Sequence, residues 1–296
     1  MLETICVKNP RELVKQLRLE VAAADAAVLI APQPDMQKWL SALGPLANKV
    51  LGWPLTGITQ AEDKVNSTQV PSLLVVPEQP DWKFFPLDTN TKNENTFGES
   101  TAAQWYAQHL RAANVWALKP NDRCGGSDVW RITLRTPIAD FDVARQTIAQ
   151  LREEIPGETL GKQRLLWSPW IDGEPGSLLI LATPRGWWCF PPCRQNLQFR
   201  SIAIPPAFQA LVSKIETVTY QGSEFVPNLL TTGSSRLLWE QFAGGMNRGQ
   251  RQSLLGWFGI DFVAATPEHA TLIEVNPRLT SSYNLHRHWR FAPPNS

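Results

Sequence analysis

Residues 256–283, GWFGIDFVAATPEHATLIEVNPRLTSSY, contain two runs that fit each other as the strands of a hairpin. The runs 256–265 and 271–277 are both rich in β-branched and aromatic residues. The residues between them, TPEH at 266–269, have the composition of a turn. The stretch therefore predicts an antiparallel β-hairpin.

The turn sets which side chains of the hairpin meet. With the loop centred between Pro267 and Glu268, Asp261 lies opposite Glu274. Side chains two positions apart along a strand share a face, so Asn276 joins the two carboxylates on one face of the hairpin. The other face, which we expect to turn toward the core, then carries Ile260, Phe262, Ile273 and Val275.

The opposed acids indicate a cation. Directly opposed side chains have Cβ atoms about 4.5–5.5 Å apart, and like charges there are destabilising. Asp261, Glu274 and the amide oxygen of Asn276 form an all-oxygen set that suits Mg²⁺, which binds few protein groups and keeps water and phosphate ligands. Gly259, opposite Asn276, has no side chain to block a ligand, and the guanidinium of Arg278 can grip phosphate or carboxylate oxygens. The alternative is that both acids are solvated on an exposed sheet face.

Composition limits the classes of function. The chain has 296 residues, of which 43% are hydrophobic and 19% charged, as is ordinary for a globular protein with a sizeable core. A net charge of +1 gives no electrostatic reason to expect nucleic acid or an anionic membrane as a partner. The sequence shows no secretory signal and no apolar run of membrane-spanning length, so we expect a cytoplasmic protein.

Cysteine, histidine and tryptophan do not suggest further sites. Four cysteines are too few for a disulfide scaffold, and the spacing of Cys189 and Cys193 is not that of a zinc knuckle. His286 and His288, near the end of an expected helix at 281–289, are interpreted as surface or ion-pairing groups. The thirteen tryptophans follow no repeat, so core packing is favoured over a carbohydrate-binding surface.

The N-terminal part of the chain alternates between helix and strand patterns. We expect helices at 11–24 and 34–46 and a short strand at 26–31. Residues 78–103 are polar and low in aliphatics, and are interpreted as a loop or linker with the character of a lid. An amphipathic helix is expected at 140–155.

A second candidate binding segment is VWALKPNDRCGGSDVWRI at 115–132. Its glycines, Gly125 and Gly126, let a backbone approach a phosphate closely, and Lys119 supplies a point charge at the end of a strand. The alternative is a purely structural glycine hairpin. Farther along, Arg194 and Asn196 suit a substrate carboxylate, with an ordinary hairpin turn as the alternative.

These motifs together resemble the ATP-grasp superfamily, mainly over 115–130 and 256–283. The resemblance implies that Asp261, Glu274 and Asn276 bind Mg²⁺ or Mn²⁺ and that Arg278 contacts the reacting acyl phosphate. It also implies a set of ATP contacts: Lys64 of AEDKVNST, Lys119, Gly125 and Gly126 of the flap, and Trp170 and Ile171 of a hinge that follows Ser168-Pro169.

The resemblance further implies an α/β fold, built as α+β lobes, in which two lobes clamp the nucleotide. We expect a shortened pre-ATP-grasp α/β domain at 1–60, a small lobe at 61–165 that includes the lid or linker, and a large lobe with the metal hairpin at 166–296. The opening strand and helix that usually precede this region in the family are not recognised in the sequence, so we expect either a chain that begins late or a reduced first domain.

The activity implied is an ADP-forming carboxylate-amine ligase that uses ATP and small-molecule carboxylate and amine substrates. Many members of the superfamily form homodimers. KPNDRCGG and EVNPRLTSSY most resemble the tyramine-glutamate ligase group of methanofuran biosynthesis. The alternative is a nucleotide-binding pseudoenzyme or regulatory subunit, because the hinge carries Pro169, which cannot donate a backbone hydrogen bond.

Overall fold

The structure, a computed structural model, describes residues 10–25, 27, 33–50, 70, 72–77, 82–87, 99–120, 129–154, 165–183, 186–244, 256–276, 280 and 282–286. The elements in these residues are α1 (Pro10–Ala23), α2 (Gln33–Leu43), η1 (Gly44–Lys49), β1 (Ser72–Pro77), β2 (Trp82–Leu87), α5 (Glu99–His109), β3 (Val115–Pro120), β4 (Val129–Leu134), α6 (Phe141–Glu154), β5 (Leu165–Pro169), β6 (Glu174–Thr183), β7 (Gly186–Cys189), β8 (Cys193–Ile202), η3 (Pro206–Phe208), β9 (Val212–Phe225), α7 (Thr232–Gly244), β10 (Gly256–Thr266), β11 (His269–Asn276) and α9 (Tyr283–His286).

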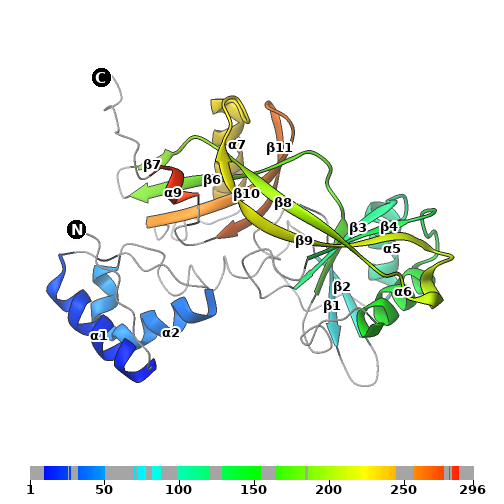
Figure 1. Ribbon diagram of the computed structural model, residues 1–296, viewed down its shortest axis with the longest axis horizontal. Coiled ribbons are helices and arrows are strands. Elements are labelled where there is room, and N and C mark those ends of the chain that lie inside the picture. The colour runs from blue at the N-terminus through cyan, green and yellow to red at the C-terminus, as the bar shows by residue number, and fades with distance from the viewer. Residues whose placement is uncertain are drawn as a thin grey trace.

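The strands pair side by side into one antiparallel sheet. Within the described residues the order is β11-β10-β6-β8-β9-β4-β3-β5-β1-β2, and β7 pairs with β6. The long strands β8 and β9 form a ribbon that runs diagonally between the two ends of the sheet (Figure 1). Their register shifts between Asn196 and Leu197, so the ribbon contains a β-bulge near its middle. Together with the helices this gives the expected combination of α+β lobes.

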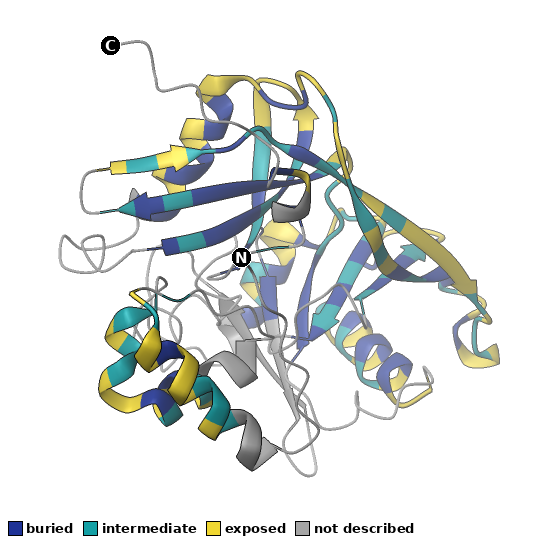
Figure 2. Cartoon of the chain, turned by 60° about the vertical axis from the view of Figure 1, so that its left-hand side comes forward, coloured by how far each residue is buried: buried dark blue, intermediate teal, exposed yellow. Residues whose placement is uncertain are grey.

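Two hydrophobic cores occupy the two ends of the sheet. One packs β6, β10 and β11 against α7 and includes Val21, Leu40 and Leu43 from the N-terminal helices. The other packs β3, β4 and β5 against α5 and α6, and Trp116 and Trp167 meet edge to face in it with ring centroids 4.8 Å apart. Buried residues cluster at both ends in Figure 2. Core packing is thus confirmed for several of the tryptophans.

The alternation of β3 and β4 explains which side chains leave the second core. Both strands bury every second residue, and Trp116 and Trp130 are 0% and 2% exposed. Because successive side chains point to opposite faces, Lys119 and Arg131 lie on the face turned away from this core. Two charged side chains are therefore presented to the same side of the sheet.

The interpretation of residues 78–103 as a loop or linker is wrong in two places. Trp82–Leu87 forms β2, which pairs with β1 over six residues, and α5 begins at Glu99. The polar composition of the whole segment masked the short run WKFFPL, which has the aromatic content of a strand. The rest of the segment lies outside the described residues.

The expected N-terminal helices are confirmed, with α2 ending at Leu43 and η1 following it. Most of the expected strand at 26–31 lies outside the described residues, but Ala27 forms a parallel bridge with Val50. Helix α6 buries the expected apolar face, which includes Ala144, Ile148 and Leu151.

The C-terminal hairpin has the predicted pairs at the end away from its turn. Asp261 pairs with Glu274, and Gly259 pairs with Asn276. A bulge follows Asp261, so Phe262 pairs with Leu272. Leu272 is therefore the buried residue, and the expectation that Ile273 faces the core is wrong. A one-residue shift turns a side chain to the other face of a sheet, which is why Ile273 lines a cavity instead.

Gly176 on β6 allows the ring of Phe262 to pack on the neighbouring strand. A Cβ built at Gly176 would overlap that ring. Gly176→Ala is therefore expected to lower the free energy of unfolding by about 1–3 kcal/mol, the usual cost of overpacking a core. Chemical denaturation followed by circular dichroism measures this change.

Gly233→Ala is the matched control. Gly233 is exposed at the start of α7, where the nearest atom to an added Cβ is 3.7 Å away. Alanine there is expected to leave stability unchanged or to raise it by up to about 1 kcal/mol. Equal effects of the two substitutions would show that Phe262 does not need the space at Gly176.

Candidate active site

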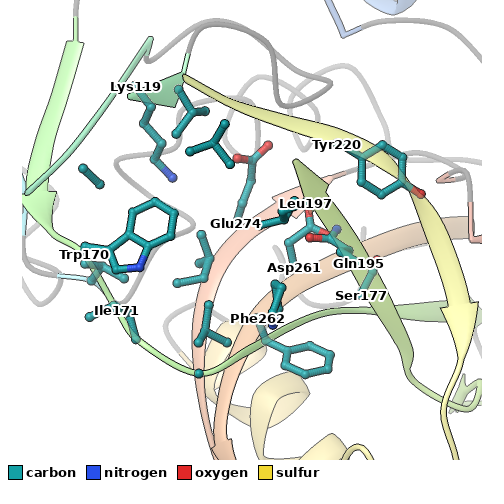
Figure 3. A pocket seen from close by; sticks show the side chains of 18 of the residues that line it. Lys119, Trp170, Ile171, Ser177, Gln195, Leu197, Tyr220, Asp261, Phe262 and Glu274 are labelled. Carbon is teal, nitrogen blue, oxygen red and sulfur yellow. The ribbon is translucent and has the colours of Figure 1, made fainter. Parts of the chain in front are cut away.

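A cavity of about 820 Å³ lies between the two cores. It is lined by β3 and β4 on one side, by β10 and β11 on the other, and by β8 and β9 across its end. Figure 3 shows Lys119 and Trp170 on one wall and Asp261 on the other, with Lys119 and Glu274 extending toward each other. Its size falls within the range of small-molecule sites, about 300–1,000 Å³.

The carboxylate of Asp261 is held by two amides. Gln195 Nε2 donates to Asp261 Oδ1 at 2.8 Å, and Asn276 Nδ2 donates to Asp261 Oδ2 at 2.9 Å. Asp261 and Glu274 are half-buried and Asn276 is buried. Because the NH₂ group of Asn276 faces Asp261, its carbonyl oxygen is directed elsewhere and keeps its acceptor capacity.

The oxygen donors at this point fit a hard divalent cation. Two carboxylates on paired strands lie beside a buried amide, and Mg²⁺ takes such oxygen ligands while keeping water and phosphate ligands. No group of three or more His, Cys, Asp and Glu side chains with metal-binding placement occurs in the described part of the chain. The oxygen atoms available to a cation at this point are those of Asp261, Glu274 and the Asn276 amide.

The space over Gly259 is filled by the chain itself. A Cβ at Gly259 would overlap the methyl group of Thr280, whose hydroxyl lies 2.7 Å from Ser282 Oγ. The expectation that Gly259 leaves room for a ligand is therefore wrong, because the side chain of Thr280 packs over it. The glycine instead lets Thr280 line the cavity.

The expected hinge lies at the end of β5. Trp170 and Ile171 both line the cavity, and Trp170 N–H donates to Val115 O at 2.9 Å. Pro169 has no N–H to donate, and the N–H of Trp170 is bonded to Val115 O. Of Pro169, Trp170 and Ile171, Ile171 is therefore the residue whose backbone N–H could bond adenine. The hinge thus offers fewer backbone donors than three consecutive residues with N–H groups would.

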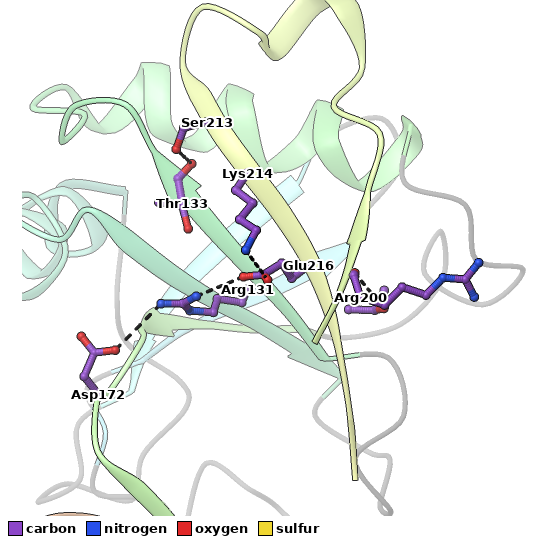
Figure 4. Close-up of polar contacts among 8 residues, drawn as sticks. Arg131, Thr133, Asp172, Arg200, Ser213, Lys214 and Glu216 are labelled. Carbon is purple, nitrogen blue, oxygen red and sulfur yellow. Dashed lines mark hydrogen bonds and ion pairs between the residues drawn. The ribbon is translucent and has the colours of Figure 1, made fainter. Parts of the chain in front are cut away.

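Arg131, which the sequence did not single out, joins this wall to β9. Its guanidinium carbon lies 5.3 Å from the ring centroid of Trp170, and its Nη1 bonds Glu216 Oε2 at 3.0 Å. Lys214 Nζ reaches the other oxygen, Glu216 Oε1, at 2.6 Å. Figure 4 shows the two cations around the buried carboxylate. Glu216 therefore fixes the orientation of the Arg131 guanidinium beside the hinge.

The charge state of Glu216 follows from these bonds. Burial alone would raise its pKa, but the hydrogen bonds from Lys214 and Arg131 outweigh burial and hold the pKa below the ordinary value. A carboxyl with a lowered folded-state pKa stabilises the fold at pH values above its unfolded pKa of about 4.3. That contribution is lost as the pH falls through the lowered folded-state pKa.

Glu216→Gln is accordingly expected to make the free energy of unfolding less dependent on pH in the acid range. The variant loses about 1.5–3 kcal/mol at neutral pH, as charge-assisted hydrogen bonds disappear. Its stability should then fall less than that of the wild type between about pH 5 and about pH 3. Urea denaturation at several pH values checks this, with Glu240→Gln on the exposed face of α7 as the control. Parallel stability curves for the wild type and Glu216→Gln would contradict the assignment.

Arg194 and Asn196 lie within strand β8, and the hairpin-turn alternative is therefore wrong for them. Arg194 Nε lies 2.9 Å from Glu174 Oε2, and its Nη1 lies 3.3 Å from Glu224 Oε1. A guanidinium between two carboxylates is poorly suited to bind a third one. Asn196 lines the cavity at the bulge of the ribbon.

Four of the expected site residues lie outside the described residues. They are Lys64, Gly125, Gly126 and Arg278. Of the others, Lys119, Trp170, Ile171, Arg194, Asn196, Asp261, Glu274 and Asn276 all line the one cavity.

His286 was expected at the surface, and this expectation is wrong. It is 3% exposed, and its Nε2 lies 3.5 Å from Cys193 Sγ, with the ring against Phe190. Burial raises the pKa of Cys193 to about 11 and lowers the pKa of His286. Both groups are therefore neutral near pH 7, and both are packed in the interior beside Phe190.

A family model described as "ATP-grasp domain" matches residues 102–282, which is more than half of the chain. The chain belongs to the ATP-grasp family. The match includes β3, the hinge and the whole C-terminal hairpin, and so spans all the cavity walls described above. No curated protein shows significant sequence similarity to the chain.

Solved structures agree with the ATP-grasp fold. D-alanine–D-alanine ligase from Bacillus anthracis matches with a TM-score of 0.52 and 12% identity over 93% of this chain and 75% of its own. The biotin carboxylase domain of 2-oxoglutarate carboxylase from Hydrogenobacter thermophilus, in complex with MgADP and bicarbonate, matches with a TM-score of 0.54 and 15% identity over 95% of this chain. VanG D-Ala:D-Ser ligase from Enterococcus faecalis matches with a TM-score of 0.51 and 10% identity over 86% of this chain.

The chain spans 55% of the length of the matched biotin carboxylase chain and 64% of VanG. At these identities the matches show the fold, and they confirm the expected ATP-grasp architecture. Among the described residues, no helix of this ATP-grasp protein is long and apolar enough to cross a membrane.

Proposed function

We propose that this ATP-grasp protein is an ATP-dependent carboxylate-amine ligase that forms an amide and releases ADP and phosphate. The observation that carries the proposal is the pairing of Asp261 with Glu274 across the cavity from Lys119. One wall thus offers a cation for phosphate oxygens, and the other offers the oxygen ligands of a divalent cation.

The residues present fit the nucleotide and its cation. Asp261, Glu274 and Asn276 would hold Mg²⁺ or Mn²⁺, which neutralises charge on the nucleotide phosphates when bound. Lys119 would donate to the phosphates from β3, and the hinge residues Trp170 and Ile171 would border the adenine. By family resemblance, Lys64, Gly125 and Gly126 would add phosphate contacts, and Arg278 would stabilise the transferring group.

The reaction needs positioning more than covalent catalysis by the protein. A carboxylate oxygen of the substrate attacks the γ-phosphorus of ATP, the bond to the β-phosphate oxygen breaks, and ADP leaves. The amine nitrogen then attacks the acyl-phosphate carbon, phosphate leaves, and the nitrogen loses a proton. Walls that hold the reactants in line and exclude water supply most of the rate enhancement.

We further propose a substrate class and a cellular setting. The motifs KPNDRCGG and EVNPRLTSSY support an amino-acid carboxylate and an aromatic amine, as in the tyramine-glutamate ligase group and its role in methanofuran-like one-carbon cofactors. The same resemblance supports a cytoplasmic enzyme, a homodimer, and the division into a shortened domain at 1–60 and lobes at 61–165 and 166–296.

A coupled assay of ADP release over a panel of carboxylates and amines tests the activity. ADP release that depends on both substrates, with glutamate and tyramine among the active pairs, is the expected result. Binding of MgATP without turnover on any pair would favour the alternative, a nucleotide-binding pseudoenzyme or regulatory subunit. The proline in the hinge, Pro169, is the feature that motivates this alternative.

A further inference from the structure

A row of polar side chains crosses three neighbouring strands on the cavity face. Ser177 on β6 pairs with Asp261 on β10, which pairs in turn with Glu274 on β11. Directly paired residues of adjacent strands project to the same side of a sheet. Ser177 is thus the third member of the row that contains both carboxylates. Figure 3 shows Ser177 close to Gln195 and Asp261.

Ser177 is a buried polar residue whose bonding the protein does not complete. It is 3% exposed and lines the cavity, and its Oγ has no hydrogen-bond partner among the described residues. Most buried hydroxyl groups in proteins are hydrogen-bonded. We therefore expect Ser177 Oγ to bond a group that enters the cavity next to Asp261.

Gln195 fixes the orientation of Asp261 from strand β8, which is separated from β10 by β6. Its Nε2 donates to Oδ1 at 2.8 Å, and Asn276 Nδ2 donates to Oδ2 at 2.9 Å. One amide from each side therefore fixes the orientation of the carboxylate. The carbonyl oxygen of Gln195 lies at the other end of its amide and is a neutral acceptor.

The chemistry of the cation explains why such groups belong here. Mg²⁺ dehydrates reluctantly and keeps several of its waters when it binds a protein. Those waters are strong donors, and they need acceptors around them. Ser177 Oγ and the carbonyl of Gln195 are acceptors that add no charge next to the two carboxylates.

We propose that Gln195 and Ser177 form an outer shell of the divalent-cation site, in which Gln195 positions Asp261 and Ser177 bonds a water of the hydrated cation. The inference rests on the cation site of the proposed function, but it does not depend on turnover. It assigns a role in cation binding to two residues on β6 and β8, outside the hairpin that carries the ligands.

Titration with Mn²⁺ tests the proposal directly. The free Mn²⁺ signal in electron paramagnetic resonance gives the Kd for the cation at saturating ADP, and calorimetry in EDTA gives the Kd for ADP without a cation. Ser177→Ala and Gln195→Leu are each expected to weaken Mn²⁺ binding about tenfold to a hundredfold, the usual effect of removing outer-shell partners. Binding of cation-free ADP is expected to stay within twofold of the wild type, and Ser177→Thr, which keeps the hydroxyl, is expected to restore most of the affinity.

Matched controls come from two residues of β9 that do not line the cavity. Ser213→Ala removes an exposed hydroxyl that bonds Thr133 O, and Gln221→Leu removes an exposed amide that bonds Gln198. Both are expected to bind Mn²⁺ like the wild type. Melting temperatures of all variants report whether the fold is retained.

The outcomes separate this inference from the proposed function. Mn²⁺ affinities of Ser177→Ala and Gln195→Leu within twofold of the controls would overturn it, and so would an equal loss of cation-free ADP binding. A wild-type protein that binds no Mn²⁺ would overturn it as well. A further outcome is that the wild type binds Mn²⁺ and the variants bind it more weakly, while no substrate pair gives turnover. That outcome would support the outer shell and contradict the proposed ligase activity.

Discussion

Glu274→Gln is expected to lower substrate-dependent ADP formation by at least about a hundredfold while leaving the fold intact. The substitution keeps the shape of the side chain and removes one of the two negative charges that face each other on β10 and β11. A cation at this point stabilises charge on the transferring phosphate, and groups that do so contribute a factor of about 10²–10³ in rate. Turnover is measured by coupled ADP release at saturating MgATP.

Glu268→Gln provides the control for this prediction. Glu268 lies in the turn of the same hairpin, is exposed, and accepts a hydrogen bond from Thr266 at 3.0 Å. Its replacement is expected to change neither turnover nor melting temperature. Undiminished turnover in Glu274→Gln would remove Glu274 from the set of cation ligands.

Lys119→Met is expected to raise the Kd for MgADP about tenfold to a hundredfold. Lys119 extends into the cavity from the face of β3 opposite the core, and methionine keeps the length of the side chain without the charge. A hydrogen bond to a charged group contributes about 1.5–3 kcal/mol, which corresponds to this range of affinity. Isothermal titration calorimetry measures the change.

Lys214→Met distinguishes a local effect from a loss of net charge. Lys214 lies on β9, where it bonds the buried Glu216, and it does not line the cavity. We expect its replacement to lower stability and to leave nucleotide affinity unchanged. Equal losses of affinity in both variants would show that Lys119 acts through the overall field of the protein.

The hairpin shows how much of the site could be predicted from sequence. Counting residues outward from the turn pairs Asp261 with Glu274, and the structure has this pair because the register shifts between Ala264 and Thr266 and between Asp261 and Phe262 offset each other. The alternation of β3 likewise placed Lys119 on the open face. Both cases depend on the local alternation of residues along a strand, which can be read directly from the sequence.

What the sequence did not predict depends on contacts between distant segments. Gln195 and Ser177 meet Asp261 because β6 lies between β8 and β10, and no local pattern encodes this strand order. Arg131 meets Glu216 across 85 residues of chain for the same reason. The bulge at Ile273 has no residue signature such as a glycine, so the face of that residue could not be read from alternation.

The bulge in the β8–β9 ribbon has a mechanical consequence. It lies at Asn196, beside Gly222 with a φ of +139°, in the segment that joins the two separately packed cores. A bulge is a natural bending point in a strand pair, and a glycine adds torsional freedom there. We expect the angle between the two halves of the molecule to change about this point when a nucleotide arrives, with each half moving as a rigid body and neither interior being repacked.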